Sequence, residues 1–409
     1  MANTLVTPEW ATMEVAMYFV NSLRGVANFD RSYSDEFVQA GGKVGDTIKI
    51  RLPQQFEAST GEALEVQNLL DRTVNLILNR RRHVGFGWSS AQATTDLDDI
   101  RNRYVQPAAE TLASIYDRVS LADVYKSVYN MVGTLGTIPA AGLTYSTAVS
   151  KILDLSGPDE GLVAILSPLS NATIAAATSL MFHPGGKLAE NWTKGQFAAE
   201  QLGISKWFTD QNTPRLTTGA VTVASTPLII GAGQTGSTML TDGWGVAAGT
   251  LVKGDIVSFA GVYWVNPVSK ENTGRLAQFS LTADVAVNAT GTLSITPPII
   301  TTGALQNVSN SPADNAVVTY WTLVAGATLA SVVSPQNLVF HPKAFASAMA
   351  DLVMPNGGAK GTRVNSKQLN VAMRYVEQYQ VTSDQNLNRL DILFGSAPVQ
   401  ERMACRVVG

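Results

Sequence analysis

The middle of the chain changes character, and this change constrains the fold more than any other feature. From Ala220 to Ser334 the sequence is rich in Thr, Val, Gly, Ala and Asn and has almost no helical periodicity. Its short alternating runs, such as DIVSFAGVYWV and TLSITPPII, are separated by turn residues, which is typical of an antiparallel barrel or sandwich. Mixed helix and strand patterns lie on both sides, so we predict a β domain inserted into an α+β body.

Two aromatic residues stand side by side in this stretch, in the run KGDIVSFAGVYWVNP. Successive side chains of a regular strand point to opposite faces, so Tyr263 and Trp264 are predicted to face opposite sides. One ring can then fill the interior of the β domain while the other meets solvent or a neighbouring domain.

The first fifth of the chain predicts a helical arm followed by a long loop. Thr7 and Pro8 are typical of a helix start, and Gly25 is typical of a left-handed helix stop. The alternating runs GDTIKIRLPQQF and RTVNLILNRRRHVGFGWSS then flank the polar segment EASTGEALEVQNLLD. We therefore predict a two-stranded loop that leaves the body of the protein.

A long helix is predicted next. Thr95 and Asp98 form a capping-box pattern, and an apolar stripe at helical spacing continues to about Val132. Pro107 must either kink this helix or begin a second one. From Pro107 to Val132 the helix would be about 39 Å long, more than the width of a small domain.

Composition bounds the function. The 409 residues suffice for about two to four structural units, and the formal charge of −3 gives no general attraction to nucleic acid or to an anionic membrane. No stretch approaches the ~20 apolar residues of a membrane span, and the N-terminus does not resemble a secretory signal. We expect a protein that is made and folded in the cytoplasm, in which the single cysteine, Cys405, is a small buried strand residue.

Motifs that carry chemistry are scarce. GAGQTG, from Gly231 to Gly236, matches the dinucleotide fingerprint, but the turn-rich STMLTDGWG follows it where a helix would have to begin. A β-turn is the favoured interpretation. His83, His183 and His341 are too scattered for a metal cluster, so we expect no cofactor, no metal site and no enzymatic activity.

The densest basic cluster is NRRRHVG, which contains Arg80, Arg81 and Arg82. These arginines could contact phosphate, could meet acidic groups of another subunit, or could simply solvate the base of the loop. The residues alone leave these three interpretations open.

Several long segments resemble the major coat proteins of short-tailed bacteriophages of the P22 type. The resemblance lies in KGQFAAEQLGISKWFTDQNTPRLTTG, VYWVNPVSKENTGRLAQFSLT, LSITPPII, LQNVSNSPADNAV, NLVFHPKAFASAMADLVMP and RYVEQYQVTSDQNLNRLDILFG. It implies the HK97-type capsid fold, an α+β architecture with an N-terminal arm, an extended β loop, a spine helix and an axial domain that carries an inserted antiparallel β barrel.

Transferred by position, the resemblance divides the chain into seven segments. They are the arm (1–42), the extended loop (43–82), the peripheral domain with the spine helix (83–161), the axial domain (162–219), the inserted β domain (220–334), the continued axial domain (335–361) and the C-terminal strands of the peripheral domain (362–409).

The function implied is that of a major capsid protein of a tailed double-stranded DNA bacteriophage. Its copies would form pentamers and hexamers of an icosahedral shell, assembled in the host cytoplasm with a scaffolding protein, a portal and a possible decoration protein. The shell would enclose DNA without sequence-specific binding and without a membrane. Contacts between subunits are expected from these residues: Lys49, Arg51, Glu57, Glu62, Glu65, Arg80, Arg81 and Arg82.

Two other classes of function remain as alternatives. A β-rich surface-attachment or carbohydrate-binding protein would stack Trp244, Tyr263 and Trp264 on sugars. A nucleotide-dependent oxidoreductase would rest on GAGQTG alone.

Overall fold

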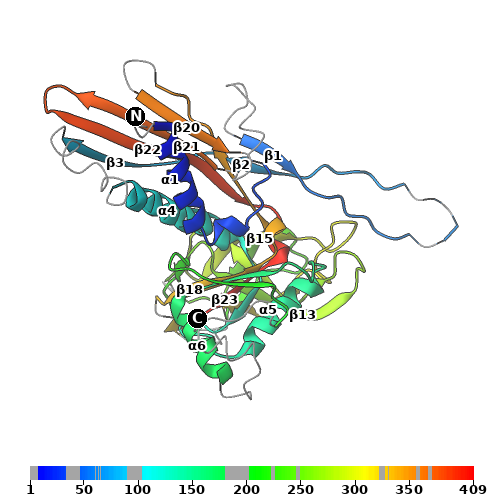
Figure 1. The fold of residues 1–409 in the computed structure, drawn as a ribbon. Helices are drawn as coiled ribbons and strands as arrows, with labels where there is room; N and C mark the ends of the chain where they lie inside the picture. The colour runs from blue at the N-terminus through cyan, green and yellow to red at the C-terminus, as the bar shows by residue number, and fades with distance from the viewer. Residues whose placement is uncertain are drawn as a thin grey trace. The chain divides into compact units, whose positions relative to one another are not determined.

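The fold of the computed structural model is drawn in Figure 1. Its chain divides into two compact units. The first contains 1–50, 73–123 and 345–397, and the second contains 51–72, 124–344 and 398–409. The structure describes residues 8–33, 47–59, 61–62, 64, 66–89, 104–179, 202–222, 226–245, 249–321, 328–329, 331–355, 360–366 and 371–409.

The first unit is built on a five-stranded sheet in the order β19-β22-β21-β20, and β3 pairs with Gln385–Phe394 of β22, on the edge opposite β21. Its elements are α1 (Pro8–Ser22), η1 (Val26–Asn28), β1 (Thr47–Arg51), β2 (Thr73–Ile77), β3 (Arg80–Ser89), α4 (Gln106–Val124), β19 (Phe345–Ala350), β20 (Lys360–Ser366), β21 (Val371–Gln380) and β22 (Gln385–Pro398). Leu390, Ile392 and Phe394 of β22 are fully buried on one sheet face. That face lies against α4, because the rings of Tyr116 and Phe394 meet edge to face with centroids 4.6 Å apart.

Helix α4 is the predicted spine, but it is shorter than predicted. Its α-helical part begins at Gln106, directly after the π-helical residues 104 and 105, and Pro107 lies in its first turn. It ends at Val124, and 19 residues give a length of about 28 Å. Beyond Val124 the chain makes a 3-10 turn and pairs as a strand from Met131, so backbone pairing ends the helix before the predicted Val132. Thr95 and Asp98 lie outside the described residues.

A buried carboxylate on α4 holds the end of the N-terminal arm. Asp117 accepts hydrogen bonds from the backbone N–H groups of Arg24 and Val26, both at 2.8 Å. Gly25 does not act as a left-handed stop, because its φ is −71°. A Cβ atom at this position would come within 2.9 Å of the Leu121 side chain, so a larger residue would require that side chain to shift.

Strands β1 and β2 form the predicted two-stranded loop, which we call the hairpin segment (residues 47–77). Ile48 and Ile50 are buried while Lys49 and Arg51 are exposed, so the predicted alternation is confirmed. Beyond the strands, Leu52 N–H donates to the Arg72 carbonyl at 2.9 Å. Figure 1 shows the two arms of the segment side by side beyond β1 and β2.

The second unit contains a mixed sheet in the order β4-β23-β18-β5-β6. Its elements are η3 (Tyr125–Ser127), β4 (Met131–Gly133), α5 (Gly142–Asp154), β5 (Val163–Leu166), α6 (Pro168–Ser179), β6 (Lys206–Thr209), β7 (Arg215–Thr217), β18 (Val333–Phe340), η4 (Pro342–Ala344), η5 (Glu401–Met403) and β23 (Ala404–Val408). Helix α5 buries Tyr145, Ala148, Val149 and Ile152, the spacing of one helical face, in a core with this sheet.

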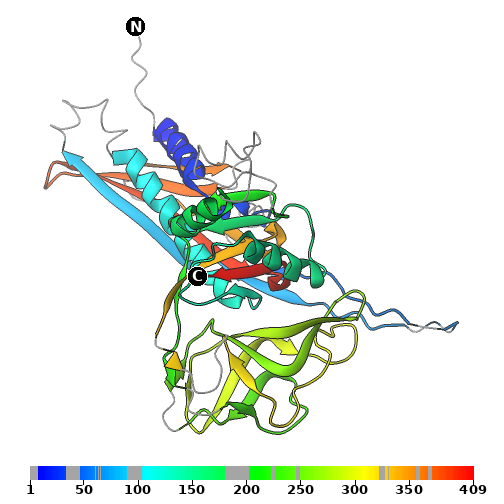
Figure 2. The same ribbon diagram turned by 90° about the horizontal axis from the view of Figure 1, so that it is seen from below.

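The inserted domain of the same unit consists of strands, as predicted (Figure 2). They are β8 (Val221–Thr222), β9 (Leu228–Ile229), β10 (Gly236–Asp242), β11 (Gly249–Leu251), β12 (Ile256–Val265), β13 (Asn272–Leu281), β14 (Val285–Val287), β15 (Thr290–Ile299), β16 (Val318–Tyr320) and β17 (Thr328–Leu329). One sheet has the order β16-β12-β13-β15-β10-β9 and the other has the order β14-β11-β8-β17. A bridge between Leu228 and Val317 brings the ends of the larger sheet together, so it is nearly closed.

The C-terminal residues are shared between the units. Phe345–Ala397 belongs to the first unit and Pro398–Gly409 to the second. Strand β23 is buried throughout and pairs with both β18 and β4. Its Cys405 is fully buried, as predicted.

Candidate functional site

The hairpin segment exposes large apolar side chains. They are Phe56, Leu64, Val66, Leu69 and Leu70, with exposed fractions between 59% and 89%. Hydrogen bonds between its two arms fix their spacing, since Gln54 Nε2 donates to Asp71 Oδ1 at 3.1 Å and Glu57 N–H donates to Gln67 Oε1 at 3.0 Å. An ordered pair of arms with uncovered leucines is a surface suited to a partner.

The charged residues predicted on this segment are exposed. Lys49 and Arg51 point outward from β1, and Glu57 and Glu62 are exposed beyond it. Glu65 lies outside the described residues.

The three consecutive arginines do not act as one cluster. Arg80 forms a bidentate ion pair with Asp123 of α4, at 2.7 and 3.1 Å, which raises the pKa of the Arg80 guanidinium. Arg81 points to the opposite face of β3 and lies 3.4 Å from Asp391. Arg82 is exposed and donates to the Arg81 carbonyl. Arg80 is therefore an internal contact, and adjacent arginines on a strand are separated by its two faces.

Asp391 is the centre of a charged cluster that the sequence did not predict. Its carboxylate is fully buried and contacts three guanidinium groups, those of Arg374 at 2.5 Å, Arg389 at 2.8 Å and Arg81 at 3.4 Å. Burial by itself raises the pKa of Asp391, but the hydrogen bonds from Arg374 and Arg389 outweigh it, so the pKa is lowered. The residues are distant in sequence, and only the strand register brings them together.

That register extends the cluster across the sheet. His83, Asp391, Arg374 and Arg363 are direct partners on β3, β22, β21 and β20. Arg363 also pairs with Asp351 at 2.9 Å. We call this surface the arginine row, meaning Arg81, Arg363, Arg374 and Arg389 with the carboxylates of Asp351 and Asp391. It lies on the sheet face opposite the one that packs on α4, because Asp391 alternates with Leu390 and Ile392.

A second buried charge lies in the second unit. The Asp255 carboxylate accepts hydrogen bonds from Tyr320 Oη at 2.6 Å and from the Val252 N–H at 2.8 Å, while burial raises its pKa. Arg406 of β23 is fully buried and donates to the Gly254 carbonyl at 2.8 Å, and burial lowers the pKa of its guanidinium to about 10. These groups hold the inserted domain against strand β23 of the mixed sheet, which is a structural role.

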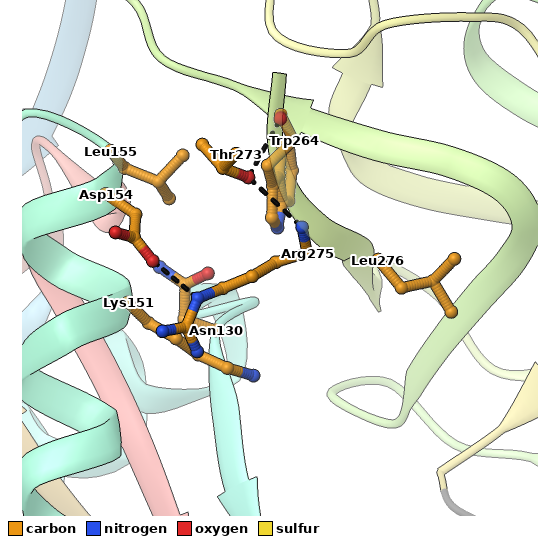
Figure 3. Close-up of a pocket in the computed structure, with 8 residues that line it drawn as sticks. All are labelled: Asn130, Lys151, Asp154, Leu155, Trp264, Thr273, Arg275 and Leu276. Atoms are coloured by element: carbon orange, nitrogen blue, oxygen red, sulfur yellow. Dashed lines mark hydrogen bonds and ion pairs between the residues drawn. The ribbon is translucent and has the colours of Figure 1, made fainter. Parts of the chain in front are cut away.

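A shallow recess between α5 and the β12–β13 hairpin is lined by Lys151, Asp154, Trp264 and Arg275, with Asn130, Leu155, Thr273 and Leu276 (Figure 3). Arg275 Nε lies 2.5 Å from Asp154 Oδ2. Lys151 donates to Gln278 Oε1 at 2.8 Å, and burial lowers the pKa of its ammonium group. Arg275 pairs with Asp154 and Lys151 is held by Gln278, so the recess is a joint between α5 and the inserted domain.

The rival functions find little support. Trp244 is fully buried and donates to Thr241 Oγ1, and Trp264 is 5% exposed, so neither ring can stack on a sugar. The GAGQTG segment leads into strand β10, without the helix that a dinucleotide site requires.

Within the described part of the chain, no group of three or more metal-ligating side chains comes together. No helix among the described residues is long and apolar enough to cross a membrane. His183 lies outside the described residues, whereas His341 directly follows β18 and its Nδ1 accepts the Lys343 N–H at 3.2 Å.

Comparisons with known proteins identify a family. The model of the family described as P22 coat protein, gene protein 5, matches residues 33–407. No curated protein matches the sequence. Among solved structures, the chain is similar to one described as Mycobacterium phage Che8, at 10% identity and a TM-score of 0.44, over 94% of this chain and 90% of that one.

Two further structures show the range of similarity. The capsid of Ralstonia phage GP4 matches at 8% identity and a TM-score of 0.43, over 90% of this chain and 84% of that one. The CUS-3 coat protein I-domain matches at 22% identity and a TM-score of 0.19, over 24% of this chain and 95% of that one.

Proposed function

This chain belongs to the P22 coat protein family, and from this premise we propose that its hairpin segment joins neighbouring copies of the chain. The protein is the major capsid protein of a tailed double-stranded DNA bacteriophage, a structural component of the virion whose copies associate into an icosahedral shell. Its architecture is the expected HK97-like α+β fold with an inserted antiparallel β domain.

The exposed apolar side chains of the hairpin segment carry the proposal. Burying one leucine side chain contributes about 1.5–3 kcal/mol, whereas an exposed ion pair contributes only ~0–1 kcal/mol. Leu64 and Leu69 are 89% and 72% exposed. Apolar burial therefore dominates the affinity of a contact, and Lys49, Arg51, Glu57, Glu62 and Glu65 set its orientation. Repetition around a symmetric shell multiplies the contribution of each contact.

The proposal extends to the stages of assembly. Subunits first form pentamers and hexamers, and a scaffolding protein, a portal and a decoration protein act as partners of the shell. The segment boundaries predicted from the sequence remain part of this proposal, with the arm, extended loop, peripheral, axial and inserted domains as its working parts. The closed shell contacts DNA without reading its sequence.

Replacing Leu64 and Leu69 by serine tests the role of the hairpin segment. Because both side chains are exposed, the subunit keeps its far-ultraviolet circular dichroism and its urea midpoint, but closed shells are lost from negative-stain micrographs and sedimentation profiles. Val268→Thr is a matched control, since Val268 is 75% exposed in the inserted domain. Normal shell yield from the double serine variant would show that the hairpin segment does not join subunits.

A further inference from the structure

We propose that the joint between the inserted domain and the mixed sheet opens and closes while both parts stay folded, and that the buried Arg406 guanidinium keeps the closed state only slightly more stable than the open one. Both parts belong to the second unit. Opening lets a shell subunit place its inserted domain differently in different surroundings. Only this use in the shell rests on the function proposed above, because the opening itself is a property of the single subunit.

The first step is the incomplete hydrogen bonding of Arg406. Its side chain, on β23 of the mixed sheet, is fully buried and donates through Nη1 to the Gly254 carbonyl of the inserted domain at 2.8 Å. Its Nε and Nη2 have no hydrogen-bond partner, and neither has the buried Oδ1 of Asn130 in the recess of the same joint. Buried polar atoms without partners are unfavourable, and water would satisfy them. The closed joint is therefore less stable than a fully paired one.

The second step is that Asp255, the residue after Gly254, has its hydrogen bonds without Arg406. Its Oδ2 accepts from Tyr320 Oη at 2.6 Å and from the Gly219 N–H at 3.3 Å. Its Oδ1 accepts from Trp321 Nε1 at 3.3 Å. These donors lie where the chain enters and leaves the inserted domain, so Asp255 ties the two ends of that domain together. The inserted domain therefore keeps its fold when the contact to Arg406 is lost.

The third step is the polar character of the other contacts across the joint. Gln278 Oε1 of β13 accepts hydrogen bonds from Lys151 Nζ at 2.8 Å and from the Met131 N–H at 2.9 Å. Arg275 of the same strand pairs with Asp154 of α5. Polar groups can exchange one another for water, which is typical of interfaces between parts of a chain that move.

Hydrogen exchange of the unassembled wild-type subunit tests the opening. The Met131 N–H crosses the joint, because its acceptor is the Gln278 side chain. Its exchange is expected to be at least about tenfold faster than that of amides paired within β12–β13 and β18–β23, which report unfolding of the two parts. Equal rates would overturn the proposal, since the joint would then open only when the whole unit unfolds.

The variant Arg406→Met tests the role of the guanidinium. Methionine has a similar length but no charge and no donor, and apolar replacements of buried charges often leave a fold as stable or more stable. Exchange at Met131 is expected to slow on the order of tenfold, while exchange within β12–β13 is unchanged and the yield of closed shells falls. Unchanged or faster exchange at Met131 would show that Arg406 does not favour the open state.

Two companion variants keep this test sound. Arg406→Met with Asp255→Asn removes both buried charges, so it is measured if circular dichroism shows that the single change disturbs the fold. Slower exchange at Met131 supports the proposal there too, and unchanged or faster exchange rejects it. Arg215→Met is a matched control, because Arg215 is an exposed arginine on β7 of the same unit, and wild-type exchange at Met131 is expected.

The readouts separate this proposal from the function proposed above. The variant Leu64→Ser with Leu69→Ser is expected to lose shells while Met131 exchanges at the wild-type rate. If that variant assembles normally, the role of the hairpin segment is wrong and the exchange results for the joint still stand. If Arg406→Met slows exchange but gives wild-type shell yield, the joint opens without serving assembly, and its use in the shell is overturned.

Discussion

Replacing Trp264 and Tyr263 by alanine, one at a time, compares the stability contribution of a core residue with that of its exposed neighbour in the same strand. Trp264 is 5% exposed, and its ring centroid lies 5.1 Å from that of Tyr129 and 5.4 Å from that of Phe279. Tyr263 is 36% exposed, so the two rings lie on opposite faces, as the sequence predicted. The change Trp264→Ala therefore opens a cavity, whereas Tyr263→Ala removes a partly solvated ring.

The expected loss follows from the buried area. A tryptophan buries up to about 250 Å², which at about 25 cal/mol per Å² gives an upper limit of about 6 kcal/mol. Substitutions of this kind in cores cost about 3–5 kcal/mol because neighbours relax only in part. We expect Trp264→Ala to lower the free energy of unfolding by that amount, and Tyr263→Ala to lower it by about 1 kcal/mol or less.

Urea unfolding of the unassembled subunit, followed by far-ultraviolet circular dichroism, measures the difference without relying on tryptophan fluorescence. The Trp264→Ala midpoint should fall well below that of Tyr263→Ala, and shell yield should fall with it. Equal midpoints for the two variants would refute the assignment of Trp264 to the joint between Tyr129 and the inserted domain.

Three further predictions concern buried polar groups. Asp117→Ala leaves the N–H groups of Arg24 and Val26 without their acceptor, so the free energy of unfolding should fall by on the order of 3 kcal/mol. An unchanged urea midpoint would contradict this role. Burial and the Lys343 charge lower the pKa of His341 in the folded state, so the unfolded chain binds more protons below about pH 6.5 and stability falls on acidification. The urea midpoint at pH 7.5 and 5.5 checks this, and His341→Asn should reduce the difference. Burial raises the pKa of the Cys405 thiol to about 11, so a thiol reagent should label it only as fast as the subunit unfolds.

Periodicity was enough to predict individual elements. Alternation in Thr47–Arg51 correctly predicted that Ile48 and Ile50 are buried while Lys49 and Arg51 are exposed, because the choice of strand face depends on local sequence. The end of α4 at Val124 was not predicted, because the following residues pair with β23, which lies at the far end of the chain.

The candidate site was likewise predictable from the sequence only in part. The hairpin segment was found from its polar composition and its flanking strands. The ion pair of Arg80 could not be predicted in this way, because its partner Asp123 is on a helix more than forty residues away. The sequence indicated one basic cluster, NRRRHVG, but the side chains of Arg80 and Arg81 lie on opposite faces of β3.

The sequence by itself determined the family, the inserted β domain and the acidic, leucine-bearing hairpin segment, because these depend on composition and short-range pattern. The tertiary structure alone decided where charge is concentrated. Arg81, Arg374 and Arg389 meet at Asp391 only because β3, β21 and β22 pair in one register. Hydrogen bonding between strands distant in sequence sets that register, and a shift of one residue would move every side chain of a strand to the other face.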